Sequence, residues 1–338
     1  MRRPIEAAYI RRMNAESREG VSGGEGAGSG AAVETRAGYV ALVGRPNAGK
    51  STLLNALTGE RLSIVTPRAQ TTRERVMGIY TTPEAQVVFV DTPGLLEPRY
   101  LLQRSMLEAA LAALGDADLV LLLLDATRPA EARPTGEPLD ALHRRRNDLF
   151  VAVNKTDAAP ASAAEELAGW AAREFGREAF AISAAKGWGI DELRAALIAA
   201  LPVSPFLYPE DDIAVQPLRF FVAEWIRETI FEEYREEIPY STAVRIEEFR
   251  EGAIPVYIRA IVFVERESQK AILVGKGGAG IKRLGQRSRE KIEAFLGERV
   301  FLDLRVKAIP GWRRKRSALK HLGYPLPQER REGGRRAR

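Results

Sequence analysis

One segment of the sequence combines the residue types and the spacing of a phosphate-binding loop. Residues 44–51 read Gly-Arg-Pro-Asn-Ala-Gly-Lys-Ser, which fits the pattern G-x-x-x-x-G-K-[ST]. Gly44 and Gly49 allow successive backbone N–H groups to point toward an anion, and a helix beginning at Ser51 would add the positive end of its dipole. We predict that Lys50 reaches the β- and γ-phosphates of a nucleotide and that Ser51 binds Mg²⁺. The expected phosphate contacts are Asn47, Ala48, Gly49, Lys50, Ser51 and Thr52.

Two further segments are predicted to complete the metal and γ-phosphate site. A buried strand is expected at 86–90, and it is followed by Asp91 and, three residues later, Gly94. The Asp91 carboxylate can hold Mg²⁺ through water, and the Gly94 N–H can contact the γ-phosphate. A polar loop upstream contains Thr71 and Thr72, and we predict that Thr72 joins the metal when a triphosphate is bound. The residues expected to take part in catalysis are Asn47, Lys50, Thr72 and Gly94.

The tetrapeptide Asn-Lys-Thr-Asp at 154–157 predicts that the base is guanine. Asp157 can accept hydrogen bonds from the N1–H and the 2-amino group of guanine, and adenine has neither donor at these positions. We expect Asn154 to connect the base site to neighbouring loops and the stem of Lys155 to cover one face of the ring. The nucleotide is therefore predicted to be GTP or GDP. Backbone N–H groups that follow a further strand would complete the base site at Ser183, Ala184 and Ala185.

A second set of residues, in the last third of the chain, has the pattern of an RNA clamp. The sequence Gly-Lys-Gly-Gly at 275–278 follows an apolar segment and precedes a basic helix. A G-x-x-G turn lets the backbone approach a sugar-phosphate chain closely, and this is how KH domains hold about four nucleotides. We also expect Trp312, which precedes four basic residues, to offer an aromatic platform. The predicted RNA contacts are Gly275, Lys276, Gly277, Gly278, Lys282, Arg283 and Arg287.

The elements around these motifs predict an α/β fold in two parts. A P-loop domain with a mixed, mostly parallel sheet and flanking helices is expected at 37–203, and a linker rich in proline and acid at 204–212. An α+β domain of the KH type (type II) is expected at 213–324. Residues 1–36, which are glycine-rich and low in large apolar groups, and the basic residues 325–338 are predicted to be disordered.

Composition and charge exclude several classes of protein. The 338 residues include no cysteine, which excludes disulfides and thiolate metal sites and fits a reducing cytosol. The apolar run 119–124 is far shorter than the ~20 residues that span a bilayer, so we interpret it as a buried strand. Residues 310–338 carry a net charge of +8 in a chain of +6, so the positive charge is concentrated beside the predicted RNA site.

Taken in order, these motifs resemble a GTPase related to translation factors, and the last third narrows the resemblance to the bacterial Era family. The resemblance covers about residues 37–324. It implies a GTPase domain joined to a KH domain, binding of the 3′ end of small-subunit (16S) ribosomal RNA, and a role in assembly of the 30S subunit. We expect a cytoplasmic monomer. The segments that carry the likeness to Era are 237–241, 265–270, 274–278, 311–312, 318–319 and 322–324.

The sequence departs from better-known GTPases in its catalytic loop. Ras-like enzymes place a glutamine directly after the glycine of D-x-x-G to orient the attacking water, and this chain has Leu95 there. We therefore expect slow intrinsic hydrolysis, on the order of 10⁻³ s⁻¹ or below. For Asn47 two hypotheses stay open. It resembles the residue of potassium-dependent GTPases that helps to bind K⁺, or it merely stabilises its own loop.

Three functions compete on the sequence. In the first, GTP and Mg²⁺ order the loops 63–75 and 91–99, and loss of the γ-phosphate releases them and repositions the RNA-binding domain. In the second, the chain is a constitutive RNA-binding module with a structural nucleotide domain. In the third, it is a GTPase that acts at the inner membrane surface, with its basic tail on acidic lipid. Four intact residues favour the first function over the second: Lys50, Ser51, Asp91 and Asp157.

Overall fold

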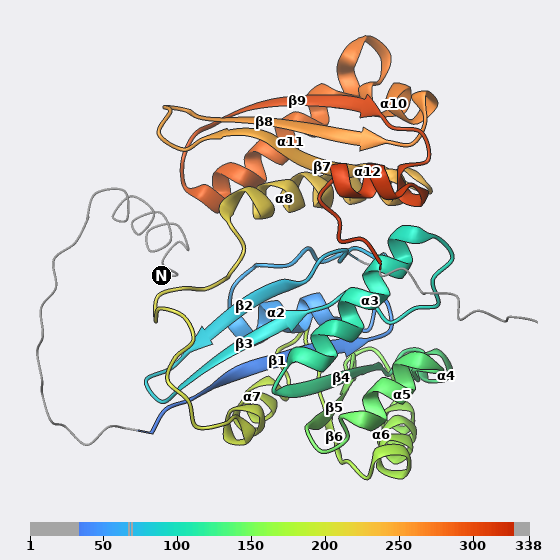
Figure 1. Cartoon of the computed structure of the whole chain (residues 1–338), viewed down its shortest axis with the longest axis vertical. Coiled ribbons are helices and arrows are strands. Elements are labelled where there is room, and N and C mark those ends of the chain that lie inside the picture. Colours follow the sequence, from blue (N-terminus) through green and yellow to red (C-terminus); the bar gives the residue numbers. More distant parts are fainter. Residues whose placement is uncertain (1–33, 67, 69, 328–338) are drawn as a thin grey trace, which may run out of the picture.

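Two β-sheets organise the residues that the computed structural model describes, which are 34–66, 68 and 70–327 (Figure 1). The first sheet and its helices form the predicted GTPase domain. Its elements are β1 (Arg36–Gly44), α2 (Lys50–Thr58), β2 (Val76–Thr81), β3 (Ala85–Asp91), α3 (Leu101–Asp116), β4 (Leu119–Asp125), α4 (Pro129–Ala132), α5 (Glu137–Arg144), β5 (Leu149–Asn154), α6 (Ala161–Phe175), β6 (Ala179–Ala181) and α7 (Ile190–Ala200).

The six strands of this sheet lie in the order β2-β3-β1-β4-β5-β6. All neighbouring pairs are parallel except β2 and β3, which are antiparallel, so the mixed, mostly parallel sheet predicted from the sequence is confirmed. The central strands are buried on both faces because α2 and α7 pack on one side and α3 and α6 on the other. In such sheets the carboxyl ends of the strands form the ligand-binding edge.

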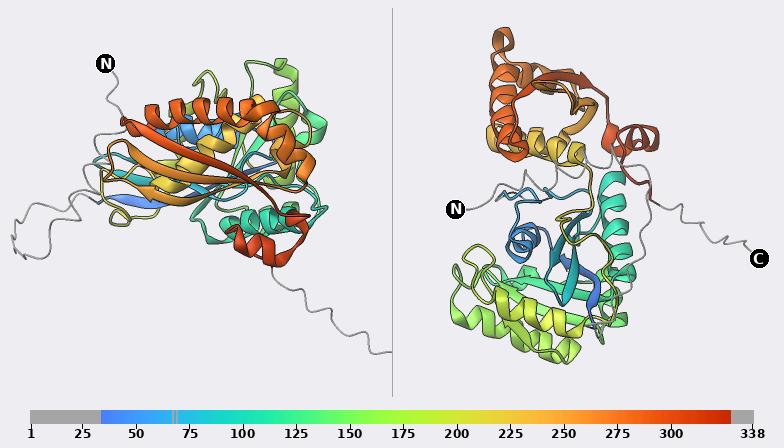
Figure 2. Two further views of the ribbon diagram at one scale, coloured as in Figure 1. Left: turned by 90° about the horizontal axis from the view of Figure 1, so that it is seen from above. Right: turned by 90° about the vertical axis from the view of Figure 1, so that its left-hand side faces the viewer.

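The second sheet belongs to the predicted KH domain. Its elements are α8 (Leu218–Glu233), α9 (Ile238–Ser241), β7 (Ala243–Arg250), β8 (Val256–Val264), α10 (Glu267–Val274), η1 (Lys276–Gly278), α11 (Ala279–Leu296), β9 (Val300–Ala308), η2 (Trp312–Arg314) and α12 (Arg316–His321). Their order is α-β-β-α-α-β when the short α9, the 3-10 turns and the final α12 are left out. β8 is central, antiparallel to β7 and parallel to β9. Helices α8 and α11 cover one face of the sheet, and the view from above shows α11 beside β9 (Figure 2).

The two domains pack against each other through α3 and the KH residues around α12 (Figures 1 and 2). Leu102 and Met106 of α3 share one buried cluster with Phe263, Trp312 and Leu319 of the KH domain. A contact between domains that contains buried apolar side chains holds them in one arrangement more firmly than a polar contact would.

The segment between the domains, 204–212, lies along the GTPase domain. The side-chain carbonyl of Gln86 on β3 accepts hydrogen bonds from the backbone N–H groups of Leu207 and Tyr208, at 2.8 and 2.9 Å. Of the two ends predicted to be disordered, residues 1–33 and 328–338 lie outside the described residues. None of the helices in the described part of the chain is long and apolar enough to cross a membrane.

Candidate functional site

The phosphate-binding loop connects β1 to α2, and close packing explains its glycines. Gly49 has φ +95°, and a Cβ there would lie 2.3 Å from the side-chain nitrogen of Asn154. At Gly94 a Cβ would lie 2.7 Å from the backbone nitrogen of Pro46. Asn47 has φ +67°, a conformation that asparagine tolerates better than most residues. The loop geometry alone therefore gives asparagine a structural reason to occupy position 47.

Lys50 is held inside this loop, with its ammonium group bound to backbone oxygens. Its Nζ donates to the carbonyls of Gly44 and Arg45 at 3.1 and 3.2 Å, and the side chain is buried. Burial lowers the pKa of Lys50 to about 8, and the nearby Asp91 carboxylate opposes that shift. A buried ammonium with two neutral acceptors is suited to an anionic ligand, because a phosphate would supply the charge that the carbonyls lack.

Three oxygen-bearing side chains from separate elements meet beside the loop. Ser51 Oγ lies 3.0 Å from Thr72 Oγ1 and donates to Asp91 Oδ2 at 2.7 Å. Asp91 is fully buried, and this burial raises its pKa, opposed first by the charge of Lys50. Its second oxygen, Oδ1, has no hydrogen-bond partner among the described residues. The structure thus brings together the three residues predicted to bind metal.

This donor set fits Mg²⁺. Two hydroxyls and one carboxylate are hard oxygen ligands, and Mg²⁺ in nucleotide sites usually combines one or two such groups with phosphate oxygens and water. The unpartnered Asp91 oxygen is the kind of buried acceptor that a cation or its water would satisfy. Within the described residues no group of three or more His, Cys, Asp or Glu could hold a metal by itself. A bound nucleotide would have to supply the remaining ligands.

At the predicted base site, the first and last residues of the Asn-Lys-Thr-Asp segment differ in burial. Asn154 is buried; its amide donates to the Ala48 carbonyl at 2.8 Å and its Oδ1 accepts from the Ala184 N–H at 3.0 Å, so it ties the phosphate loop to the 183–185 loop. Asp157 is exposed, and its carboxylate accepts from Ser183 Oγ at 2.6 Å. Its carboxylate is therefore accessible for a base.

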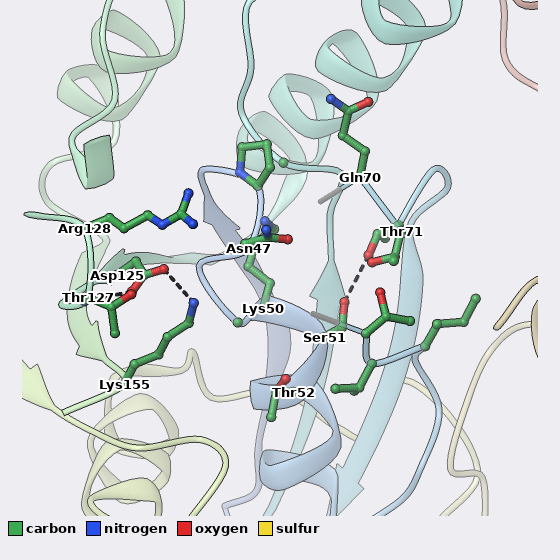
Figure 3. Close-up of a pocket in the computed structure, with 17 residues that line it drawn as sticks. Asn47, Lys50, Ser51, Thr52, Gln70, Thr71, Asp125, Thr127, Arg128 and Lys155 are labelled. Carbon is green, nitrogen blue, oxygen red and sulfur yellow. Dashed lines mark hydrogen bonds and ion pairs between the residues drawn. The ribbon is translucent and has the colours of Figure 1, made fainter. Parts of the chain in front are cut away.

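A cavity of about 380 Å³ lies beside the phosphate-binding loop and reaches Lys155 (Figure 3). Of the residues predicted from the sequence, Asn47, Gly49, Lys50, Ser51, Thr52, Thr72, Gly94 and Lys155 line it. The buried Asp91 and the base-site residues Asp157, Ser183, Ala184 and Ala185 are not among the residues that line this cavity.

One side of the cavity was not predicted from the sequence. Asp125, Thr127 and Arg128 line it, and Asp125 accepts from Lys155 Nζ at 2.6 Å and from Thr127 Oγ1 at 2.6 Å. Asp125 could have been found, because it directly follows the predicted buried strand 119–124 and so lies at the ligand-binding edge of the sheet. For Thr127 and Arg128 no local pattern was available. Gln70, from the loop that precedes β2, was missed in the same way.

The G-x-x-G turn of the KH domain has the backbone conformation that its glycines permit. Gly275, Gly277 and Gly278 have φ of +71°, +59° and +82°, all in the left-handed region. A Cβ at Gly275 would lie 2.7 Å from the backbone nitrogen of Gly280, whereas one at Gly277 would meet open space. Lys276 is exposed at the turn. The turn thus presents backbone and one cation to solvent at the start of α11.

The basic residues of α11 lie on two different faces of the helix. Lys282 lines a groove of about 500 Å³ between α11 and β9. One position further on, Arg283 donates to Glu233 of α8 at 2.8 Å, and Arg287 is paired with the same carboxylate. Residues four apart lie on one helix face, so Arg283 and Arg287 face α8 together. The three basic residues predicted to contact RNA therefore do not share one surface.

The prediction that Trp312 offers an aromatic platform for RNA is wrong. Trp312 is fully buried, its Nε1 donates to the Ser241 carbonyl at 2.8 Å, and its ring stacks on Tyr324 with 5.7 Å between centroids. The basic residues beside it suggested an exposed ring. Packing between the domains instead uses the indole as part of the core, so no face of it is open to a base.

The loop between α2 and β2, residues 59–75, which we call the switch loop, is docked on the KH domain. Arg73 is 4% exposed, and its guanidinium donates to the carbonyls of Pro239, Tyr240 and Thr242. Arg227 of α8 donates to the carbonyl of Thr71 at 2.7 Å. Both contacts satisfy buried polar groups, so they hold the switch loop to the KH domain.

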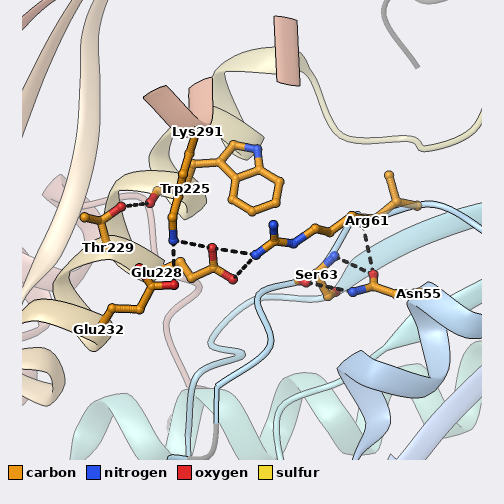
Figure 4. Close-up of polar contacts among 9 residues, drawn as sticks. Asn55, Arg61, Ser63, Trp225, Glu228, Thr229, Glu232 and Lys291 are labelled. Atoms are coloured by element: carbon orange, nitrogen blue, oxygen red, sulfur yellow. Dashed lines mark hydrogen bonds and ion pairs between the residues drawn. The ribbon is translucent and has the colours of Figure 1, made fainter. Parts of the chain in front are cut away.

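A second contact joins the switch loop to two helices of the KH domain (Figure 4). Arg61 donates to both carboxylate oxygens of Glu228 at 2.9 and 3.0 Å and lies over the Trp225 ring, 4.6 Å from its centroid. Glu228 also accepts from Lys291 of α11 at 2.7 Å. The Glu228 carboxylate is fully buried between these two cations.

Two protein families match parts of the chain. Residues 39–155 match the family described as a 50S ribosome-binding GTPase, and residues 237–313 match the KH domain family. The GTPase Era of Geobacter metallireducens is 42% identical over 294 residues, which are 86% of this chain and 98% of the relative. The GTPase Era of Thermotoga maritima is 43% identical over 284 residues, which are 83% and 94% of the two chains.

Two solved structures resemble the whole described chain. One is Era in complex with MgGDPNP and nucleotides 1506–1542 of 16S ribosomal RNA, with a TM-score of 0.81 and 40% identity, covering 86% of this chain and 100% of that one. The other is Era of Aquifex aeolicus bound to GDP·AlF4⁻, with a TM-score of 0.78 and 38% identity and the same coverage. The likeness thus extends over both domains.

Proposed function

The chain belongs to the Era family of GTPases, and we propose that it is a switch in which GTP controls binding of the 3′ end of small-subunit ribosomal RNA. The chain is a GTPase with a KH domain. Its RNA partner is proposed because a relative of 40% identity forms a complex with that part of 16S RNA. Its cellular role would be assembly of the 30S subunit in the cytoplasm.

One observation carries the switch proposal. Thr72, whose hydroxyl lies 3.0 Å from that of Ser51 in the candidate metal site, stands between two residues that are bonded to the KH domain. Its neighbours are Thr71, which accepts from Arg227, and Arg73, which donates to three KH carbonyls. A movement of Thr72 toward a metal and a γ-phosphate would therefore pull on both domain contacts.

The nucleotide site is proposed to use Mg²⁺ held by Ser51, Thr72 and, through water, Asp91. When bound, the ion would neutralise charge on the β- and γ-phosphates. Lys50 would add a fixed positive charge, and the N–H of Gly94 would contact the γ-phosphate. Asp157 would select guanine, with Asn154 keeping the base and phosphate loops at a constant separation. These roles agree with the complexes of MgGDPNP and GDP·AlF4⁻ in the relatives.

Intrinsic hydrolysis is proposed to be slow because of the position of Leu95. This side chain is 2% exposed, and its backbone N–H donates to the Gly44 carbonyl at 2.9 Å. A buried aliphatic side chain cannot orient a water molecule as glutamine does in other GTPases. Asn47 would assist by helping to bind K⁺, in which case hydrolysis is faster in potassium than in sodium chloride. Equal rates in the two salts would leave Asn47 with its structural role alone.

RNA is proposed to bind along the groove between α11 and β9. Lys276 at the turn and Lys282 in the groove would contact phosphates, and the exposed backbone of the turn would lie against the sugar-phosphate chain. The groove is open, as single-stranded RNA requires. Arg283 and Arg287 would raise the local positive potential from the neighbouring helix face.

The proposal is tested by steady-state hydrolysis with the full chain. We expect turnover of GTP but not of ATP, and a change in the rate when RNA corresponding to nucleotides 1506–1542 of 16S RNA is added. A control RNA of equal length that lacks the single-stranded 3′ end should change the rate less. ATP turnover equal to that of GTP would contradict the guanine site. A hydrolysis rate that neither RNA changes would favour a nucleotide domain that is uncoupled from RNA binding.

A further inference from the structure

The groove between α11 and β9 has an aromatic wall that no motif in the sequence marks. Phe301 of β9 lines it together with Ile281, Lys282 and Gln286 of α11. Phe301 is 56% exposed, although phenylalanine is usually buried. Tyr257, the residue directly opposite on β8, is partly covered. A large exposed ring in a groove beside a cation is a feature of surfaces that bind another molecule.

This ring is the open end of a stack that crosses all three strands. Tyr257 and Phe301 lie with their rings nearly parallel, at 10°, and their centroids 5.7 Å apart. On the other side of Tyr257, the guanidinium of Arg250 on β7 lies 5.0 Å from the ring centroid. β9 is the edge strand of the three-stranded sheet, so the second face of Phe301 has no strand beside it. One face of Phe301 is thus held, and the other is free.

We infer that the free face of Phe301 stacks with a base of single-stranded RNA. This inference rests on the proposed function, because it requires the groove to hold RNA. A base would extend the existing row of Arg250, Tyr257 and Phe301 by one flat ring. Since Tyr257 already restricts the Phe301 ring, little side-chain freedom remains to be lost when the base stacks. Stacking is tolerant of sequence because every base has a π-face.

The charges of the groove favour RNA over an apolar peptide as the occupant. Lys282 and Arg289 line the same groove as Phe301, and no carboxylate of the described residues lines it. Alternating basic and aromatic side chains match a strand that alternates phosphates and bases. A peptide with an apolar anchor would fill the space beside Phe301 but would bring no negative charge to Lys282, whereas Arg289 already has a long ion pair, 4.0 Å, with Glu293.

The test compares variants of Phe301 in the full chain loaded with a non-hydrolysable GTP analogue. The probe is labelled RNA corresponding to nucleotides 1506–1542 of 16S RNA, and the readout is its dissociation constant. Phe301→Ala should weaken binding by about 5- to 150-fold, the range expected for loss of one stacked base. Phe301→Leu should weaken it nearly as much, and Phe301→Trp should preserve it. Ile254→Ala, at a fully exposed apolar residue of the β7–β8 hairpin, is the matched control and should change little.

A second measurement detects the stack itself. 2-Aminopurine, placed in turn at each purine of the single-stranded 3′ segment, should be quenched on binding at one position with the wild type and not with Phe301→Leu. If Phe301→Leu binds the RNA as tightly as the wild type and quenches 2-aminopurine equally, the stacking inference is overturned. The proposed RNA site would still stand in that case. Failure of the wild type to bind this RNA would overturn the proposed function as well.

Discussion

The nucleotide pocket and the RNA groove hold their functional groups in different ways. In the pocket, the charged groups Lys50 and Asp91 are buried and bonded to loops whose shape glycines impose. In the groove, Lys282 and Phe301 stand on the surface of a helix and a strand, and the space between them is open. A pocket that must detect the presence of one additional phosphate needs fixed charges that are shielded from water. A groove for a flexible RNA strand can rely on separate surface contacts.

This difference predicts that single substitutions are more damaging in the pocket than in the groove. Asp157→Ala should weaken GDP binding by about 10²- to 10⁴-fold, because two hydrogen bonds to a charged acceptor are lost at about 1.5–3 kcal/mol each. Isothermal titration calorimetry measures the change. Ser183→Ala, which removes the 2.6 Å contact to Asp157 and leaves the carboxylate in place, should cost less than tenfold. Equal losses in the two variants would show that Asp157 does not contact the base.

The contact between the GTPase and KH domains should be the next most sensitive to single substitutions. Arg73→Met leaves several buried carbonyls of the KH domain without a donor, so we expect the domain contact to lose about 3 kcal/mol or more. Calorimetric unfolding should then show the two domains melting separately. Arg75→Met is the control, because Arg75 is 41% exposed and pairs with exposed Asp116 within the GTPase domain. A single unchanged transition in both variants would contradict a role for Arg73 in docking.

In the groove, a change at the glycine turn should have a moderate effect. Gly275→Ala places a Cβ 2.7 Å from the Gly280 nitrogen at a φ of +71°, so the turn must distort at a cost of about 1–3 kcal/mol. RNA affinity should fall by about tenfold, measured by fluorescence anisotropy, while GDP affinity stays unchanged. Gly252→Ala, where a Cβ would meet nothing within 4 Å, should be neutral. Full RNA affinity in Gly275→Ala would remove the turn from the proposed RNA site.

A last expected effect is a pH dependence of stability at the domain contact. Burial, and then the neighbouring Glu224 carboxylate, raise the pKa of Glu74 to about 7 from 4.5, so the folded protein holds this proton more tightly than the unfolded chain. The free energy of unfolding therefore falls as pH rises through this range, by about 2 kcal/mol for a partly exposed group.

Glu74→Gln removes this loss, so its stability relative to the wild type should increase between pH 5 and pH 8 in urea denaturation. Glu251→Gln, on the exposed β7–β8 hairpin, should track the wild type at both pH values. A constant difference between Glu74→Gln and the wild type would show that the Glu74 carboxyl does not titrate in this range.

The features that follow from local sequence patterns could be predicted, and those that depend on long-range contacts could not. The sheet of the GTPase domain and the grouping of Ser51, Thr72 and Asp91 follow from local patterns, because polar residues after parallel strands meet at one edge. Trp312 was misjudged because it packs in one buried cluster with Leu102 and Met106 of the GTPase domain, and no local pattern encodes a contact across more than a hundred residues. Phe301 was missed for a related reason, since its open face depends on the order of the strands.

In the proposed switch, the bound nucleotide changes the RNA affinity of the KH domain through the switch loop. The most direct test measures the affinity of the full chain for RNA corresponding to nucleotides 1506–1542 of 16S RNA, once with GDP and once with a non-hydrolysable GTP analogue. We predict at least a tenfold difference, or about 1.4 kcal/mol of coupling, and its reduction in Arg73→Met but not in Arg75→Met. Equal affinity in the two nucleotide states of the wild type would contradict the account.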